Sequence, residues 1–326
     1  TIVEKTDINS TINGYPIIPY SKIRKWRSCS ANAQKLCSLN HGRSATSFNK
    51  TKKESSIPLE ERITVVVKTI NSRGSLVIRM IRSLWEFYNK MKVIIVGETN
   101  PNFHPGNDLY DFIMENQQYL VYIQVTVDSG ISYGRNVGVN AASTDLIFLI
   151  DDDVMFTNET DLRKMVNIID TSDISLVAGV YHLGLTGIFH ILKSRLYIFK
   201  YTFYEKLPYF EHCYRTDITQ NVFLAKREDL IKTDMWRPDQ KILEHLDFFL
   251  TLRKHGLKVA SCLDINLKHD RLATGSTKTR SKTEIFKYRG MYQFNWGLEG
   301  WYTSCNPSHY HDPINVLETF CQKLIH

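Results

Sequence analysis

The chain has 326 residues, of which 43% are hydrophobic and 23% are charged, so it can bury a substantial core and has the composition of a globular protein. Its 41 Lys and Arg residues against 34 Asp and Glu residues give a net charge of +7, a mild excess that suits a phosphate-bearing ligand. The basic residues do not form a stripe interleaved with aromatic side chains, which argues against a nucleic acid as the partner.

Residues 1–60 are rich in Ser, Asn and Lys and lack a sustained hydrophobic period. This composition predicts a stem or an N-terminal flap. No apolar run approaches the roughly 20 residues needed to cross a bilayer. Because the chain starts at Thr1, we expect membrane association only through a segment outside it, for which a signal anchor is one candidate.

A folded domain is expected at 61–300, followed by a C-terminal tail at 301–326. The β-branched run 63–67 predicts a buried parallel strand, and the four-residue spacing of apolar residues from Leu76 to Tyr88 predicts a helix.

The rest of the domain alternates between strands and helices. Further strands are expected at 93–96, 119–127, 146–150 and 174–180 and near Val259, and further helices are expected from about 133, at 161–169 and around 246–252. The alternation predicts an α/β fold with a mostly parallel central sheet flanked by helices. Such sheets bind ligands beyond the carboxyl ends of their strands.

Three consecutive carboxylates, Asp151, Asp152 and Asp153, follow the apolar run 146–150, so they are expected where a buried strand ends. Like charges this close repel one another unless a cation neutralises them. Carboxylate oxygens suit Mn²⁺ or Mg²⁺, and such an ion can stabilise the charge that develops on a leaving diphosphate. The alternative is a solvated acidic turn, but the position behind a buried strand favours the metal site.

Gly134, Arg135 and Asn136 lie upstream of the aspartates, at the expected start of a helix. A glycine at this position lets the backbone approach a ligand, and the Arg135 guanidinium can bind a phosphate or a carboxylate. An ordinary helix start with a surface arginine is the alternative.

Glu244 and Asp247 are spaced one helical turn apart at the start of an amphipathic segment, so they are expected on the same side of the helix. The helix dipole favours their ionised forms, as a general base requires. Apolar neighbours would desolvate the Asp247 carboxylate and raise its pKa toward neutrality, which makes Asp247 the candidate base. The alternative role is dipole compensation in the first turn.

His269 follows the last predicted strand and offers an imidazole as a third metal ligand, although a lone histidine is more often a surface or core residue. The basic residues after it are set among Gly, Ser and Thr, which predicts a loop that could close on a diphosphate. These residues are Arg271, Lys278, Arg280, Lys282, Lys287 and Arg289.

The chain contains six cysteines without a C-x-x-C pair, which makes zinc and thioredoxin-like sites weak interpretations. Disulfides in an oxidising compartment and unpaired thiols are both compatible with their spacing.

Several of these motifs occur in the order seen in a known family. They are the strand 63–69, Gly134-Arg135-Asn136, Asp151-Asp152-Asp153 with Phe156-Thr157, the segment 221–225, the helix segment 245–249 and His269. From Arg62 to Asp270 the chain therefore resembles the β-1,4-N-acetylgalactosaminyltransferases of the ganglioside and Sd(a) type. The ordered set is far more specific than any single motif.

The resemblance implies a GT-A fold, in which a Rossmann-like nucleotide-binding part merges with an acceptor-binding half. It implies UDP-N-acetylgalactosamine as donor, Mn²⁺ (or Mg²⁺) as cofactor, a glycolipid or glycoprotein glycan as acceptor, and inversion at the anomeric carbon. It also implies a location in the Golgi lumen with a type II anchor, and it leaves a homodimer open.

The resemblance also implies roles for single residues. Asp151 and Asp153 would hold the metal together with His269, and Asp247 would take the proton of the acceptor hydroxyl. The nucleotide site would be lined by Lys68, Thr69, Arg73, Glu98, Gly134, Arg135, Asn136, Asp151 and Asp152.

Two positions depart from the family pattern. Only Glu98 follows the second strand, where the family usually has paired acids, and Asp247 stands where relatives carry the longer Glu. Three other functions stay open: a family-2-like transferase that uses a different UDP-sugar, a non-catalytic nucleotide-sugar or glycan-binding protein, and a metal-dependent nucleotidyltransferase, which is less favoured because no glycine-rich phosphate loop follows the first strand.

Overall fold

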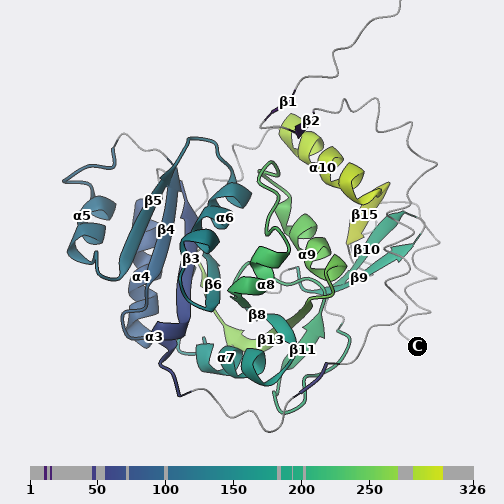
Figure 1. Cartoon of the computed structure of the whole chain (residues 1–326), viewed down its shortest axis with the longest axis horizontal. Helices are drawn as coiled ribbons and strands as arrows, with labels where there is room; N and C mark the ends of the chain where they lie inside the picture. Colours follow the sequence, from purple (N-terminus) through teal and green to yellow (C-terminus); the bar gives the residue numbers. More distant parts are fainter. Residues whose placement is uncertain are drawn as a thin grey trace, which may run out of the picture.

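A computed structural model describes residues 11–12, 15–16, 46–48, 56–70, 73–98, 102–181, 185–192, 194–200, 203–270 and 282–303 of the chain. Its centre is an eight-stranded sheet (Figure 1). In spatial order the strands are β11 (Cys213–Thr216), β13 (Lys258–Asn266), β8 (Ile174–Val180), β12 (Phe223–Lys226), β6 (Leu146–Asp151), β3 (Ile63–Thr69), β4 (Val93–Glu98) and β5 (Leu120–Val125).

The sheet is mostly parallel. Strand β3 runs parallel to both β4 and β6, and β5 runs parallel to β4. On the other side, β8 and β13 are parallel, while β12 lies between β6 and β8 and is antiparallel to both. Strand β11 pairs antiparallel with β13 at one edge. The predicted α/β class with a mostly parallel sheet is therefore confirmed.

Helices cover both faces of the sheet. They are α3 (Leu59–Arg62), α4 (Gly74–Phe87), α5 (Asp108–Glu115), α6 (Ile131–Ala141), α7 (Leu162–Thr171), α8 (Arg227–Lys232), α9 (Glu244–Lys254) and α10 (Lys282–Trp296). The alternation of strand side chains divides the core between the two faces: Val65 and Val67 belong to one buried cluster with residues of α4, α5 and α7, whereas Val66 belongs to a second cluster with residues of α6, α8, α9 and α10. Burial on both faces explains why the β3 segment is a continuous apolar run.

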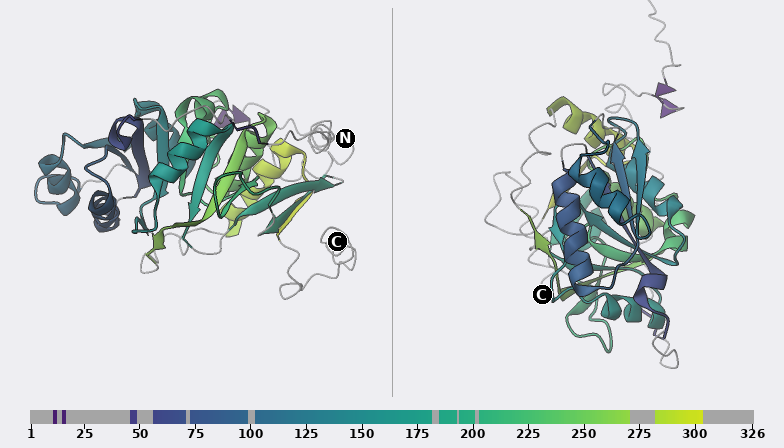
Figure 2. Two further views of the ribbon diagram at one scale, coloured as in Figure 1. Left: turned by 90° about the horizontal axis from the view of Figure 1, so that it is seen from below. Right: turned by 90° about the vertical axis from the view of Figure 1, so that its left-hand side faces the viewer.

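A second sheet lies at the end of the molecule opposite β5 (Figure 2). It contains β9 (Gly187–Leu192), β10 (Arg195–Lys200) and β15 (Gly300–Thr303), and β15 pairs parallel with β10. The boundary predicted between 300 and 301 falls inside β15. Short two-stranded pairs form between β1 (Thr11–Ile12) and β2 (Tyr15–Pro16), and between β7 (Val154–Met155) and β14 (Lys268–His269).

Four of the described helices, α3, α5, α8 and α10, are absent from the sequence-based prediction. Helices α3 and α8 are only four and six residues long, too short for a helical period to show. Helix α5 buries only Leu109 and Ile113, so its apolar stripe is too short to stand out. Helix α10 contains Lys282, Lys287 and Arg289, which were expected in a loop, so that part of the loop prediction is wrong. Its buried residues are aromatic and recur every fourth position, a helical signal that the neighbouring charges conceal. The other predicted loop positions, from 271 to 281, lie outside the described residues.

The end of the predicted stem packs against the domain. The backbone N–H and hydroxyl of Thr46 donate to Glu205 Oε1 at 3.0 and 2.7 Å, and Phe48 forms a β-bridge with Ser172. Within the described ranges, no helix combines the length and apolarity that crossing a bilayer requires.

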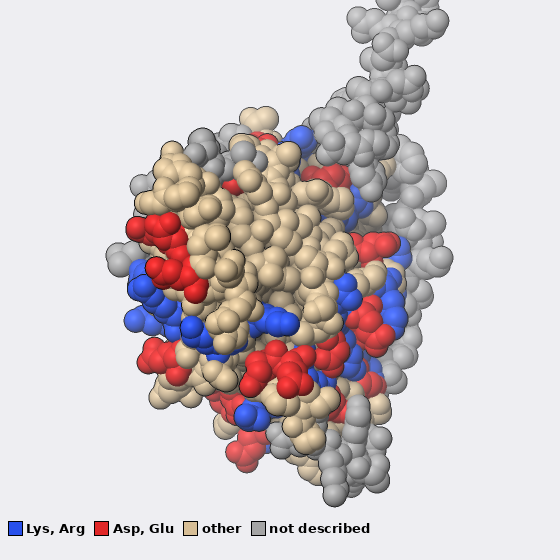
Figure 3. Space-filling model, turned by 60° about the vertical axis from the view of Figure 1, so that its left-hand side comes forward, with Lys and Arg blue, Asp and Glu red and all other residues tan. Residues whose placement is uncertain are grey.

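Strand β5 forms the other edge of the large sheet. On the face that includes this side of the molecule, Lys and Arg side chains lie next to Asp and Glu side chains, around a broad area that carries neither (Figure 3).

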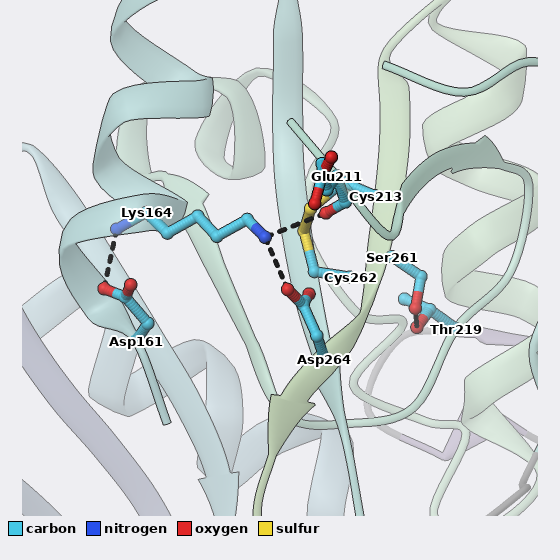
Figure 4. Close-up of a disulfide and its surroundings, with 8 residues drawn as sticks. All are labelled: Asp161, Lys164, Glu211, Cys213, Thr219, Ser261, Cys262 and Asp264. Carbon is cyan, nitrogen blue, oxygen red and sulfur yellow. Dashed lines mark hydrogen bonds and ion pairs between the residues drawn. A yellow bond between two sulfur atoms is a disulfide. The ribbon is translucent and has the colours of Figure 1, made fainter. Parts of the chain in front are cut away.

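A disulfide joins Cys213 on β11 to Cys262 on β13 (Figure 4). The two residues are direct partners in the antiparallel ladder, with Cα atoms 4.0 Å apart, and both are fully buried. Nearby, Lys164 of α7 donates to Asp264 and to the carbonyl of Glu211. For these two cysteines the structure decides in favour of a disulfide; the other four cysteines lie outside the described residues.

Removal of this disulfide is expected to destabilise the chain. The two cysteines are 49 residues apart, and a loop of that size constrains the unfolded chain by about 4 kcal/mol. We expect a Cys213→Ala/Cys262→Ala variant to lose roughly this much free energy of unfolding in urea titrations. A reducing agent should destabilise the parent chain and leave the variant unchanged; equal stability of the two oxidised proteins would contradict the prediction.

Candidate active site

The aspartate cluster lies where β6 ends. Asp151 is the last residue of β6, and it pairs in register with Lys68 on β3. Glu98 is the last residue of β4, the next strand along. The parallel register therefore brings three of the predicted nucleotide-site residues to the carboxyl edge of neighbouring strands.

Asp152 is anchored rather than directed at solvent. It is 5% exposed, its Oδ2 accepts from the Thr69 hydroxyl at 2.7 Å, and its Oδ1 lies 2.8 Å from Arg73 Nη2. The same Arg73 nitrogen lies 2.6 Å from Asp153 Oδ2. Burial raises the pKa of Asp152 to about 7, and its contacts with Arg73 and Thr69 oppose this rise. Arg73 and Thr69 thus hold the cluster together.

Lys68 and Glu98 form a partly buried ion pair, with Nζ 2.7 Å from Oε1. Gly134 allows this pair, because a Cβ atom at Gly134 would lie 2.4 Å from Lys68 Cγ. The structural reason for the glycine is therefore the close approach of the Lys68 side chain, in addition to any role toward a ligand.

Arg135 connects three elements at this edge. It is 1% exposed, its Nη2 lies 2.9 Å from Asp151 Oδ1, and its Nη1 lies 3.0 Å from Glu244 Oε1. Its guanidinium also lies over the Trp236 ring, 5.6 Å from the centroid. The alternative interpretation of a surface arginine is wrong, because Arg135 links α6, the end of β6 and the first turn of α9.

Asn136 binds the backbone of Trp236. Its Nδ2 donates to the Trp236 carbonyl at 2.6 Å, and its Oδ1 accepts from the Trp236 N–H at 3.1 Å. This pair of bonds fixes the segment before α9 against α6.

Asp247 lies on α9 one turn after Glu244 and is only 2% exposed. Its Oδ1 accepts from the indole Nε1 of Trp296 on α10 at 2.6 Å. Burial raises the pKa of Asp247, while the bond from Trp296 and the charge of Arg237 lower it. Of the two α9 acids, Glu244 is the one that Arg135 connects to the aspartate cluster.

His269 reaches the cluster through strand pairing. In the β14–β7 pair, His269 lies opposite Val154, and the Asp270 N–H donates to the Asp153 carbonyl at 2.7 Å. The His269 Nε2 lies 3.8 Å from Asp153 Oδ2, and the imidazole stacks on Tyr181 with ring centroids 5.2 Å apart. His269 and Val154, which are 115 positions apart in the sequence, are therefore adjacent in the structure.

The predicted metal ligands are only partly assembled. Asp153 and His269 are neighbours, whereas Asp151 Oδ1 is bound by Arg135. Among the described residues, the one group of three ligand-type side chains within 4.8 Å is Cys213, Cys262 and Asp264, whose cysteines form the disulfide. Two carboxylates and an imidazole are nevertheless a donor set that suits Mn²⁺. In the structure Arg73 and Arg135 offset the charge of Asp153 and Asp151.

Sequence reasoning missed three features of the site. Tyr181 stacks on His269, Trp296 donates to Asp247, and His245 Nδ1 lies 2.7 Å from Asn221 Oδ1. Burial, followed by the charge of Arg135, lowers the pKa of His245 to about 3, so its imidazole is neutral. Only Trp296 had a signal in the sequence, as part of the aromatic spacing on α10.

The sequence of the chain is similar to a known protein family and to curated proteins. The model described as Glycosyl transferase family 2 matches residues 64–232. Human β-1,4 N-acetylgalactosaminyltransferase 1 is 26% identical over 224 residues, which cover 64% of this chain and 38% of the human protein. The rat protein of the same name is 30% identical over 152 residues, 42% of this chain and 27% of the relative. The chain thus spans well under half the length of these relatives, and the resemblance drawn from the motif order is confirmed.

Solved structures agree on the fold. GalNAc-T7 with UDP, GalNAc and Mn²⁺ has a TM-score of 0.54 at 14% identity, over 71% of this chain and 48% of that structure. Residues 1–349 of S. aureus TarS in complex with UDP-GlcNAc have a TM-score of 0.51 at 14% identity, over 70% of this chain and 64% of that structure. With the family match, these similarities confirm the expected GT-A fold.

Proposed function

Because the chain belongs to glycosyl transferase family 2, we propose that it transfers N-acetylgalactosamine from UDP-N-acetylgalactosamine to a hydroxyl of a glycolipid or glycoprotein glycan. The observation that carries the proposal is the carboxyl edge of the sheet, where His269 lies beside Asp153 and Arg135 joins Asp151 to Glu244 in the first turn of α9. The names of the curated relatives support the choice of donor sugar. The UDP and Mn²⁺ named for one solved relative support a nucleotide-sugar donor and a divalent cation.

In this proposal Asp151, Asp153 and His269 hold Mn²⁺ or Mg²⁺. When bound, the ion supplies positive charge to the diphosphate of the leaving UDP. The nucleotide lies along the ends of β3, β4 and β6, where Lys68, Arg73 and Arg135 provide further cations. The remaining residues proposed for the nucleotide site are Thr69, Glu98, Gly134, Asn136 and Asp152.

The proposed reaction is a single displacement with inversion. Asp247 accepts the proton of the acceptor hydroxyl, and the hydroxyl oxygen attacks the anomeric carbon from the side opposite UDP. The bond to the diphosphate breaks as the new bond forms, so no covalent intermediate with the enzyme is required.

The disulfide supports a location in an oxidising compartment, which we propose to be the Golgi lumen. A homodimer is compatible with the proposal.

Divalent cation binding is expected to depend on Asp153. An Asp153→Asn variant loses one anionic ligand next to His269, so UDP binding that is enhanced by Mn²⁺ in the parent chain should lose most of that enhancement. Calorimetric titration of UDP with Mn²⁺ and with EDTA measures the difference. Asp264→Asn is the matched control, because Asp264 lies near the disulfide and pairs with Lys164. Equal Mn²⁺ enhancement in the Asp153→Asn variant and the parent would remove Asp153 from the ligand set.

A donor-by-acceptor activity array with added Mn²⁺ tests the proposed function. We expect transfer from UDP-N-acetylgalactosamine to a terminal sugar of a glycolipid or glycoprotein glycan. A preference for another UDP-sugar would keep the family mechanism and reject the proposed donor. Cation-dependent UDP binding without transfer to any acceptor would support a non-catalytic binding protein instead.

A further inference from the structure

Helix α10 brings an indole N–H to the carboxylate that is proposed as the base. Trp296 Nε1 lies 2.6 Å from Asp247 Oδ1, and the two residues are 8% and 2% exposed. An indole nitrogen can only donate, so the carboxylate must be the acceptor in this bond. The described residues provide no hydrogen bond to the second oxygen, Oδ2. The orientation of the carboxylate is therefore set by α10.

We propose that Trp296 is the positioning residue of Asp247: its N–H holds Oδ1 and leaves Oδ2 to accept the proton of the sugar acceptor. This inference rests on the proposed function, in which Asp247 is the base. In the step, the hydroxyl proton passes to Oδ2, the oxygen lone pair forms the bond to the anomeric carbon, and the diphosphate leaves with the electrons of the broken bond. Trp296 itself exchanges no proton.

Helix α10 is attached to the rest of the domain near its middle and just after its end, as a positioning element requires. Near its middle, the Tyr288 carbonyl accepts from Gln240 Nε2 at 3.1 Å, and the Gln240 carbonyl accepts from the hydroxyl of Ser132 on α6 at 2.5 Å. Just after the helix, the Glu299 N–H donates to the Ser194 carbonyl at 2.7 Å, and β15 then pairs with β10. The indole is thus delivered by a helix that is fixed on both sides of the contact.

Apolar surroundings by themselves favour the protonated form of Asp247. Burial raises the pKa of its carboxyl, and the Trp296 hydrogen bond is the largest of the effects that lower it. The other titratable or charged groups that face the carboxyl are Arg237 and Asp239 before α9, Glu244 on α9 and Tyr292 on α10. A base acts in its ionised form, so loss of the indole N–H should raise the pKa and move the acidic side of the rate profile to higher pH.

The test removes the N–H with a Trp296→Phe substitution. Carboxyl-labelled aspartate allows the titration of Asp247 to be followed by carbon NMR, with its signal identified by its loss in Asp247→Asn. A hydrogen bond to a charged group accounts for about one to two pKa units. We expect the pKa of Asp247 and the acidic limb of kcat/KM to rise together by this amount, while kcat on the plateau at higher pH and the KM for the UDP-sugar stay at their parent values.

Trp236→Phe is the matched control. Trp236 is also a buried indole, 1% exposed, and stacks on Phe248 with ring centroids 4.2 Å apart, next to Asp247 in the sequence. Its Nε1 has no hydrogen-bond partner among the described residues, so the loss of this N–H should leave the pKa of Asp247 unchanged. Trp296→His retains a ring N–H and should keep the pKa of Asp247 below its value in Trp296→Phe.

Three results would overturn the proposal. They are an unchanged Asp247 titration in Trp296→Phe, an equal shift in Trp236→Phe, and a change in transfer rate, in either direction, that is uniform across pH. If Trp296→Phe does not fold, site-specific benzothienylalanine at position 296 keeps the bicyclic ring without the N–H and gives the same comparison. If the parent chain transfers no sugar, the proposed function fails, and the NMR titration still decides whether Trp296 controls Asp247.

Discussion

An Asp247→Asn variant is expected to transfer sugar with a kcat about 10²- to 10⁴-fold lower than that of the parent chain, because an amide cannot accept the acceptor proton. The amide oxygen can still accept from Trp296, so the contact with α10 and the fold should persist. Affinity for UDP should be unchanged, since Asp247 is bound to α10 rather than to the strand ends. Steady-state kinetics and calorimetric titration with UDP measure the two quantities.

Glu244→Gln is the control for this experiment, because Glu244 is the other acid on the same side of α9. It is paired with Arg135, and glutamine retains an oxygen that can accept from that guanidinium. We expect a smaller loss of kcat than in Asp247→Asn. The reverse ranking, with transfer retained by Asp247→Asn and lost by Glu244→Gln, would assign the base to Glu244.

Arg135→Met is expected to lower the free energy of unfolding by about 3–5 kcal/mol, since it leaves one buried and one partly exposed carboxylate without their shared cation. These are Glu244, which is 8% exposed, and Asp151 at the end of β6. Methionine preserves much of the side-chain length, so the loss of unfolding free energy measures mainly the effect of removing the positive charge. Urea unfolding followed by circular dichroism measures it.

The comparison for Arg135→Met is Lys232→Met. Lys232 lies 3.2 Å from Glu228, one turn away on α8, with both side chains mostly exposed. Such a surface pair contributes about 0.5 kcal/mol or less. Similar losses for the two variants would show that the Arg135 network contributes no more than a surface pair.

The elements that the sequence predicts well are those buried on both faces of the sheet. Strand β8 was predicted with its observed bounds, and β3, β4 and β6 begin where expected, because a continuous apolar run needs no periodicity to be recognised. The direction of β12 could not be predicted, since a fully buried strand has the same composition whether it runs parallel or antiparallel. Strand β11 was not predicted, because its four residues carry little pattern and Cys213 pairs with Cys262, 49 positions away in the sequence.

The site divides in the same way. The parallel order of β3, β4 and β6 places Lys68, Glu98 and Asp151 at one edge, which follows from the sequence alone. The contacts of Asp247 do not, because its partner Trp296 comes from a helix that was expected to be a loop. The burial of Arg135 could not be predicted either, since it depends on the distance between α6 and α9 rather than on any local pattern.

Strand β12 has a mechanical consequence for how the protein can move. It hydrogen-bonds to β6 on one side and to β8 on the other, so the two halves of the sheet share one uninterrupted ladder. A hinge between the half of the sheet with β3 to β6 and the half with β8 and β13 would have to break that ladder. We therefore expect any closure on a ligand to occur through side chains and connecting segments at the edge of the sheet, without separation of its two halves.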